Sequence, residues 1–155
     1  MTATSAFDPA AFLDATITEA SVKRPPLPIQ DYVGVIGEIK ARTWQGKKDP
    51  NQSGVVMDVP IEFDLTGYPE VMKTLGTPKV TLTDGIMLDL TPTGMIDLAP
   101  GKNGKLRRYR DALDMNKAGE AFSFRAMQGR VIKAKIKHDP YEGDIYDKID
   151  AVSKA

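Results

Sequence analysis

Alternation of apolar and polar residues is the clearest signal in the chain, and it marks three segments as β-strands. Residues 31–44 alternate first, residues 54–65 follow after a polar loop, and residues 130–138 alternate near the end. Period-two alternation turns successive side chains to opposite faces of a strand, so each segment has one face for a core and one for solvent. We therefore predict three amphipathic strands at these positions.

The first of these strands is predicted to place its odd-numbered residues against the core. Val33 and Val35 belong to that set, whereas Tyr32 and Trp44 fall on the polar side. Two internal glycines allow the strand to bend strongly, as small barrels require.

The second strand has an acidic solvent face and contains a proline. If it pairs with the first strand, Asp58 or Glu62 lies across from Lys40 or Arg42 and forms a surface ion pair. Pro60 has no amide hydrogen to donate to a ladder, which indicates an edge position or a bulge.

The remaining segments are shorter elements separated by glycine and proline. A short helix or turn is predicted at 68–75, meandering strands at 79–83, 86–90 and 95–98, a helix at 106–113, a short buried turn at 122–128, and a C-terminal hairpin with its turn at 139–144. Strands at this spacing, with one or two short helices, predict a mainly β fold, namely a small closed or nearly closed barrel. A β-sandwich is the alternative.

Residues 1–30 differ in character from the rest of the chain. A short helix is predicted to begin at Asp8-Pro9, and the prolines between positions 25 and 28 favour an extended segment. We predict an extended or partly disordered arm over 1–30, which packs on the body or on a neighbouring subunit, and a single domain over 31–155.

Composition narrows the class of protein. Of the 155 residues, 41% are hydrophobic and 27% charged, as in an ordinary globular domain. The chain has no cysteine, which excludes disulfides and thiol zinc sites and fits a reducing compartment. No apolar run approaches the roughly 18 residues that span a bilayer. We therefore expect a cytoplasmic protein, in the host cell cytoplasm if it is viral.

Charge is distributed unevenly, although the chain as a whole is neutral with 21 basic and 21 acidic residues. Residues 102–138 contain 11 basic and 3 acidic residues, a net charge of +8, and the segments on both sides are negative. Such asymmetry indicates a surface that attracts a polyanion.

A single nucleic-acid strand is the polyanion that this pattern favours, because cations release counterions from phosphates and exposed aromatic rings stack on unpaired bases. Tyr32, Trp44 and Tyr141 are the candidate stacking residues. The candidate phosphate-binding residues are Lys40, Arg42, Lys47, Lys48, Lys105, Arg107, Arg108, Arg110, Arg130, Lys133, Lys135 and Lys137. The alternative is a solvated polar face, with aromatic rings that fill core or loop space.

Motifs for catalysis are missing from the sequence. There is one histidine, no Gly-x-Ser-x-Gly and no phosphate loop, so we predict no catalytic residues and no cofactor. His138 and the acidic residues 139–147 could ligate a hard cation, but their spacing matches no known metal motif, and we predict no metal site.

Three stretches carry a resemblance to a known family: the proline-led first strand at 23–40, the helical segment at 106–116 and the closing hairpin at 129–144. In these stretches the chain resembles the OB-fold single-stranded DNA-binding proteins of tailed bacteriophages. The resemblance implies an OB-like β-barrel that binds single strands with little sequence preference. Many such proteins end in an acidic tail that recruits partners, and residues 149–155 are not such a tail.

The function expected from these observations is non-enzymatic binding of single-stranded DNA in phage replication or recombination. Replication or recombination proteins are possible partners, no membrane is expected, and the arm is a route to a homo-oligomer. The alternative is a virion or assembly structural protein whose basic face contacts an acidic neighbour.

Overall fold

A computed structural model describes residues 8–49 and 53–155. Residues 1–7 of the predicted arm and 50–52 of the predicted loop lie outside the described residues. The elements are α1 (Pro9–Asp14), β1 (Asp31–Ile36), β2 (Lys40–Gln45), β3 (Ser53–Asp64), η1 (Leu65–Gly67), α2 (Pro69–Leu75), β4 (Lys79–Met87), α3 (Gly104–Ala112), η2 (Phe124–Met127), β5 (Val131–Tyr141) and β6 (Asp144–Ser153). This content confirms the predicted mainly β class.

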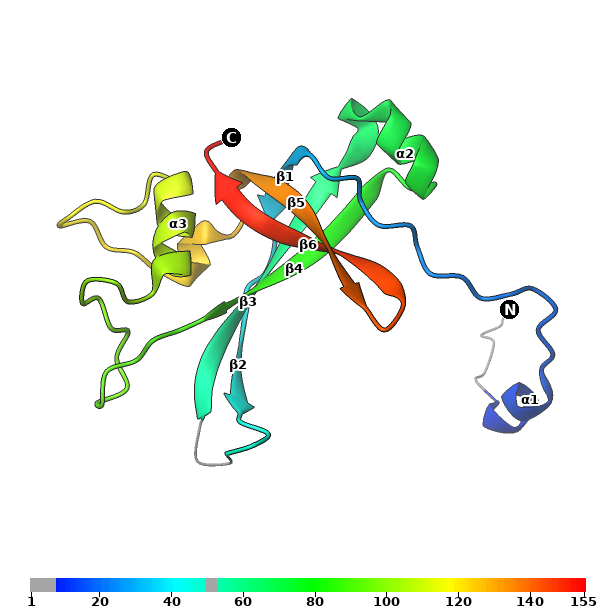
Figure 1. The fold of residues 1–155 in the computed structure, drawn as a ribbon, viewed down its shortest axis with the longest axis horizontal. Coiled ribbons are helices and arrows are strands. Elements are labelled where there is room, and N and C mark those ends of the chain that lie inside the picture. Colours follow the sequence, from blue (N-terminus) through cyan, green and yellow to red (C-terminus); the bar gives the residue numbers. More distant parts are fainter. Residues whose placement is uncertain (1–7, 50–52) are drawn as a thin grey trace, which may run out of the picture.

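The strands form one twisted antiparallel sheet in the order β2-β3-β1-β5-β6, with β4 on the other edge of β3 (Figure 1). The predicted C-terminal hairpin is confirmed as β5–β6. Within the described chain, β4 and β6 are not paired with each other, so the sheet does not close into the predicted barrel.

The first predicted strand is divided into β1 and β2 because its partner, β3, is interrupted by a proline between the two segments with which it pairs. β3 pairs with β2 over its first half and with β1 near its end, and Pro60 lies between the two ladders. Pro60 has no amide hydrogen, and its carbonyl accepts from the Gly37 amide at 2.8 Å. The chain therefore bends at Gly37, and the β2–β3 hairpin projects from the body.

The two faces of β1 are the reverse of those predicted. Tyr32 and Ile36 are buried, whereas Val33 and Val35 are exposed. Gly34 explains the reversal, because a Cβ at this position would lie 2.6 Å from Ile61 Cγ2. Only a glycine lets the core side chains of β3 approach β1 this closely, so the even-numbered residues face inward.

The predicted meander at 79–98 is also wrong, because β4 continues through Asp84-Gly85 instead of turning there. The Asp84 carboxylate accepts from Lys105 Nζ and from the Tyr109 hydroxyl, both at 2.6 Å. These bonds satisfy a polar residue that would otherwise favour a turn. The chain after β4 forms a loop with a single bridge between Leu90 and Ile96.

The core lies between the inner face of the sheet and α3. The buried apolar residues include Ile61 and Phe63 of β3, Ile132 and Ile136 of β5, and Leu106 of α3. α3 occurs where the sequence predicts it, and its apolar stripe faces the sheet. Figure 1 shows α3 and its flanking loops at one end of the sheet, away from the β5–β6 turn.

The arm has two parts. α1 begins as predicted, with Asp8 Oδ1 accepting from the Ala10 amide at 3.1 Å, and it stands clear of the sheet in Figure 1. Residues 23–28 instead lie along the β5–β6 hairpin, where the Leu27 amide donates to Asp147 at 2.8 Å and the buried Leu27 side chain joins the core.

The close approach at Gly34 generates a prediction about stability. We expect Gly34→Ala to lower the free energy of unfolding by about 1–3 kcal/mol, because the added methyl overlaps Ile61 and Phe63. Gly67→Ala is the matched control, since a Cβ at Gly67 would meet no atom within 4 Å. Urea unfolding of both variants measures the difference. If Gly34→Ala and Gly67→Ala had equal free energies of unfolding, the close approach of β3 at Gly34 would not explain why the even-numbered residues of β1 are buried.

Candidate nucleic-acid interface

Three adjoining hollows form one groove that runs from the β5–β6 hairpin across β4 to β3. The first, of about 590 Å³, is lined by Asp139, Pro140, Tyr141, Tyr146 and Lys148. It shares Asp139 and Lys148 with a second hollow of about 390 Å³, which shares Thr83 with a third of about 330 Å³. We call these hollows together the hairpin groove. In Figure 1 the β2–β3 and β5–β6 hairpins project to the same side of the view, with β4 between them.

Two aromatic rings stand at the first end of the groove. The Tyr141 and Tyr146 rings are arranged edge to face with centroids 6.3 Å apart, and Tyr141 is 64% exposed. Lys23 Nζ lies 4.4 Å from the centre of the Tyr146 ring. The predicted stacking residue Tyr141 is therefore accessible, and its aromatic neighbour Tyr146 is an additional candidate for stacking.

Trp44 stands beyond the other end. It lies opposite Gly54 on β3, and its indole fills the space that a Cβ on Gly54 would need, with Cε2 2.9 Å from that position. The ring is half-buried and is not part of the core cluster. By strand parity Trp44 shares a face with Lys40, which lines the third hollow. The indole therefore packs over Gly54 and remains partly exposed to solvent.

Ion pairs neutralise much of the charge in the groove. Arg42 Nε lies 2.6 Å from Asp58, which confirms the predicted ion pair between the first two strands. Lys105 Nζ lies 2.6 Å from Asp84, and Lys148 Nζ lies 3.2 Å from Asp139.

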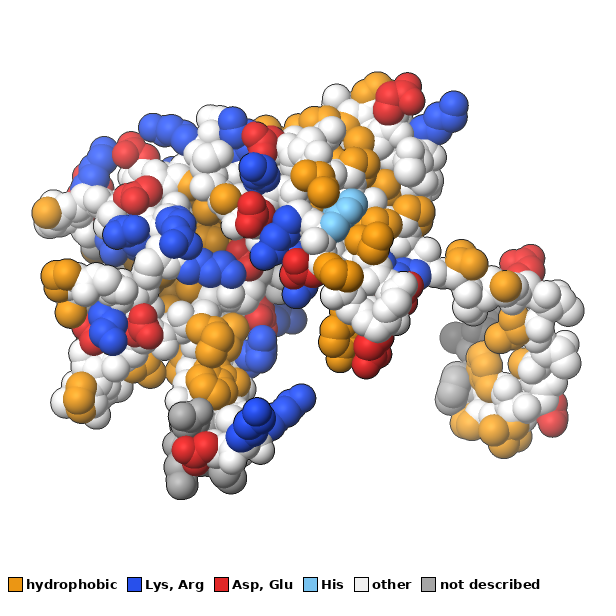
Figure 2. All heavy atoms as spheres, in the orientation of Figure 1, with side chains coloured by type: hydrophobic (Ala, Val, Ile, Leu, Met, Phe, Trp, Pro, Cys, Tyr) orange, Lys and Arg blue, Asp and Glu red, His pale blue; other side chains and the backbone are white. Residues whose placement is uncertain are grey.

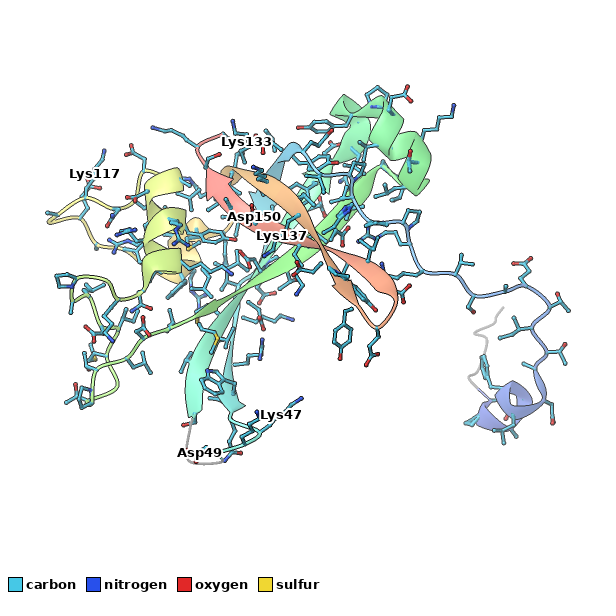
Figure 3. All side chains as sticks on the ribbon, viewed as in Figure 1. Lys47, Asp49, Lys117, Lys133, Lys137 and Asp150 are labelled. Carbon is cyan, nitrogen blue, oxygen red and sulfur yellow. The ribbon has the colours of Figure 1, made fainter. Side chains whose placement is uncertain are left out.

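Four lysines remain available in and beside the groove. Considering only the residues that the structure describes, Lys40, Lys47, Lys48 and Lys137 form no ion pair. Lys40 and Lys137 line the groove, and Figure 3 shows Lys47 near the tip of the β2–β3 hairpin. In Figure 2, basic and acidic side chains alternate over the middle of this face.

The lysines of β5 do not act as one row. Lys137 lines the second hollow of the groove, whereas Lys133 lies opposite Val33 and Lys135 opposite Asp31 on the outer face of β1 and β5. Figure 3 shows Lys137 near the centre of the view and Lys133 at the upper edge of the sheet. The groove therefore includes one of the three predicted lysines.

The predicted cations of the helical region are largely engaged elsewhere. The Arg110 guanidinium lies 4.7 Å from the centre of the Phe122 ring, and Arg130 Nη2 donates to the Leu113 carbonyl at 3.4 Å. Arg107 and Arg108 are exposed on α3, and neither lines the hairpin groove. Of the helical group, only Lys105 reaches it.

Tyr32 is wrong as a stacking residue, because its side chain is fully buried. Its hydroxyl donates to the Pro28 carbonyl at 2.9 Å, and its ring packs edge to face on Tyr68 with centroids 5.0 Å apart. Burial, and secondarily the nearby Tyr68 and Asp147, raise the pKa of the Tyr32 hydroxyl to about 12. A base cannot reach this ring, which instead holds the start of β1 against the core.

Tyr146 and Lys148 line the groove but were not predicted as site residues, and Asp139, which also lines it, was considered only as a metal ligand. A two-residue turn at Glu142-Gly143 places Asp139 opposite Tyr146. That register was available from the sequence once the turn was assigned to these two residues.

Two of the polar residues considered as metal ligands make other contacts. His138 Nε2 lies 2.6 Å from the Leu27 carbonyl oxygen, and Asp147 holds Arg24 at 2.9 Å. Over residues 8–49 and 53–155, no group of three histidine or acidic side chains is placed to hold a metal ion.

No protein-family model matches the chain, and no curated protein is significantly similar to it. Among the described helices, none has the length and apolar character needed to cross a membrane.

The tyrosines generate a prediction about alkaline pH. Burial, followed by the charge and hydrogen bond of Asp84, raises the pKa of Tyr109, so Tyr32 and Tyr109 both stay neutral where ordinary phenols ionise, near pH ~10. We expect the phenolate absorbance of the folded protein to show Tyr32 and Tyr109 ionising at higher pH than they do in the unfolded chain. The free energy of unfolding is then unaffected by these groups below pH ~10 and falls as the pH rises above it towards the raised values. If the folded protein reached its full phenolate absorbance at the same pH as the unfolded chain, this prediction would be wrong.

Proposed function

We propose that the protein binds single-stranded DNA in the hairpin groove, with little sequence preference and without catalysis. The observation that carries the proposal is the groove itself, which is lined by lysines and has the rings of Tyr141 and Tyr146 at one end. The half-buried Trp44 lies beyond the other end, on the same face of the sheet. Aromatic rings stack on any unpaired base, and lysines bind phosphates regardless of sequence. A duplex offers no unpaired base to Trp44 or Tyr141.

We further propose that the sheet is an opened form of the OB-fold. Three features support this assignment: the bent β1–β2 segment pairs with both β3 and β5, α3 lies between β4 and β5 in the chain, and the groove runs from the β5–β6 hairpin to the β2–β3 hairpin. OB-folds bind oligonucleotides on this face and between these two loops.

The biological setting follows from the sequence resemblance to phage single-stranded DNA-binding proteins. We propose a role in phage replication or recombination, in the host cell cytoplasm, with other replication or recombination proteins as partners. A virion or assembly protein is the second candidate, and the exposed Arg107 and Arg108 favour it, because they present charge outside the groove.

The lysines test the proposal through the salt dependence of binding. Four unpaired lysines predict a slope of log K against log salt of about −2.8 for labelled oligo-dT, measured by fluorescence anisotropy, with matched duplex binding more weakly. Lys137→Ala removes one contact and should bring the slope to about −2.1. Lys133→Ala, on the same strand but outside the groove, is the matched control and should leave the slope unchanged. Binding that does not vary with salt would favour the assembly protein.

Trp44 tests the stacking component separately from charge. It is the only tryptophan, so oligo-dT should quench the intrinsic fluorescence. Trp44→Ala should weaken single-strand binding by about 1–3 kcal/mol, roughly 5- to 150-fold in Kd, because one stacked base is lost. Trp44→Phe keeps an aromatic ring and should recover part of the affinity.

Stability is the control for this variant, since Trp44 is not part of the core cluster. The midpoint of thermal unfolding should change little in Trp44→Ala. A large fall in the midpoint together with unquenched wild-type fluorescence would move the stacking surface away from Trp44.

A further inference from the structure

Two surfaces outside the hairpin groove complement each other. The first is the outer face of β1 and β5, where Val35 lies opposite Val131 and Val33 opposite Lys133. The three valines are 42%, 44% and 50% exposed. We call this surface the valine–lysine face; its residues are Val33, Val35, Val131, Lys133 and Lys135. Exposed apolar residues that are contiguous on a sheet commonly mark a contact surface.

The second surface is the arm at 8–22. Leu13 is 87% exposed and Ile17 83% exposed, so the apolar side chains of this segment are not covered by the body. The segment contains three acidic residues, Asp8, Asp14 and Glu19, and no lysine or arginine. It is therefore apolar and acidic, whereas the valine–lysine face is apolar and basic.

We propose that the arm of one copy binds the valine–lysine face of a second copy, and that two copies exchange arms to form a closed dimer. Leu13 and Ile17 then cover the valines, and Asp14 and Glu19 lie near Lys133 and Lys135. Each copy offers one arm and one face, so reciprocal exchange satisfies both surfaces and leaves no open end.

The position of the arm favours a second copy over its own body. Residues 23–28 are fixed to the β5–β6 hairpin by the Arg24–Asp147 ion pair and by the buried Leu27. From there the arm leads away from the sheet, and in Figure 2 it forms a separate lobe. Figure 3 places Lys133 at the upper edge of the sheet, whereas α1 lies at the lower right.

The charges near the valine–lysine face leave it attractive to the arm. Glu62 lies opposite Val35, but its carboxylate is engaged by Lys79 at 3.6 Å. Asp31 lies opposite Lys135 and offsets one of the two lysines of the face. A net positive charge therefore remains for the acidic arm, in addition to the burial of apolar side chains on both surfaces.

Charge exchange between two variants of the full chain tests the proposal. The face variant is Lys133→Glu with Lys135→Glu, and the arm variant is Asp14→Lys with Glu19→Lys. In each variant the arm and the face carry the same sign of charge, so each should sediment as a monomer. When the two are mixed, both arms meet faces of opposite sign, and heterodimers should form. Sedimentation velocity over a dilution series measures all three samples and the wild-type dimer.

A charge reversal outside the arm and the valine–lysine face is the control. Arg107→Glu with Arg108→Glu reverses two exposed cations on α3 and should leave the dimer intact. Lys133 is half-buried, whereas the other substituted side chains are exposed, and circular dichroism verifies that the variants fold. The proposal is overturned by a wild-type protein that is monomeric at every concentration, by a face variant that still dimerises, by variants that do not associate when mixed, or by loss of the dimer in the α3 control.

Discussion

The structure depends on the pairing of β3. The backbone hydrogen-bonding groups along its two edges pair with three different strands. β4 covers one edge along nearly its full length, and the other edge is divided between β2 and β1. Pro60 lies at the division, where it accepts from Gly37 but cannot donate. This one position bends the chain, projects the β2–β3 hairpin that carries Trp44, and leaves β1 free to pair with β5.

Local periodicity predicted most elements because strand and helix patterns are encoded by neighbouring residues. It failed where a distant contact decides the outcome. The inward face of β1 depends on how closely Ile61 approaches Gly34, and the straight course of β4 depends on Tyr109 and Lys105 binding Asp84. In each case the deciding residues lie on another element, so the sequence of the strand itself does not reveal the contact.

The candidate site shows the same limit in terms of charge. The basic stretch at 102–138 is contiguous in sequence, but α3 and β5 direct its side chains to different surfaces. Acidic residues from other segments then neutralise some of them, as Asp84 does for Lys105. Tyr141 was predictable as an exposed aromatic residue of a turn, whereas its neighbour Tyr146 required the register of the hairpin. Charge counted along the chain therefore overestimates charge concentrated in space.

The β5–β6 hairpin contacts the arm and also lines one end of the groove. Its Asp147 holds Arg24 and the Leu27 amide, while Tyr146 lies beneath Lys23 and lines the groove beside Tyr141. A ligand that shifts Tyr146 would change the free energy of the Lys23 contact, and a partner that pulls on the arm would change the affinity of the groove. Thermodynamic linkage makes these two effects equal in size. If the arm and the groove bind as proposed, the Lys23–Tyr146 contact at the root of the arm would couple the two binding events.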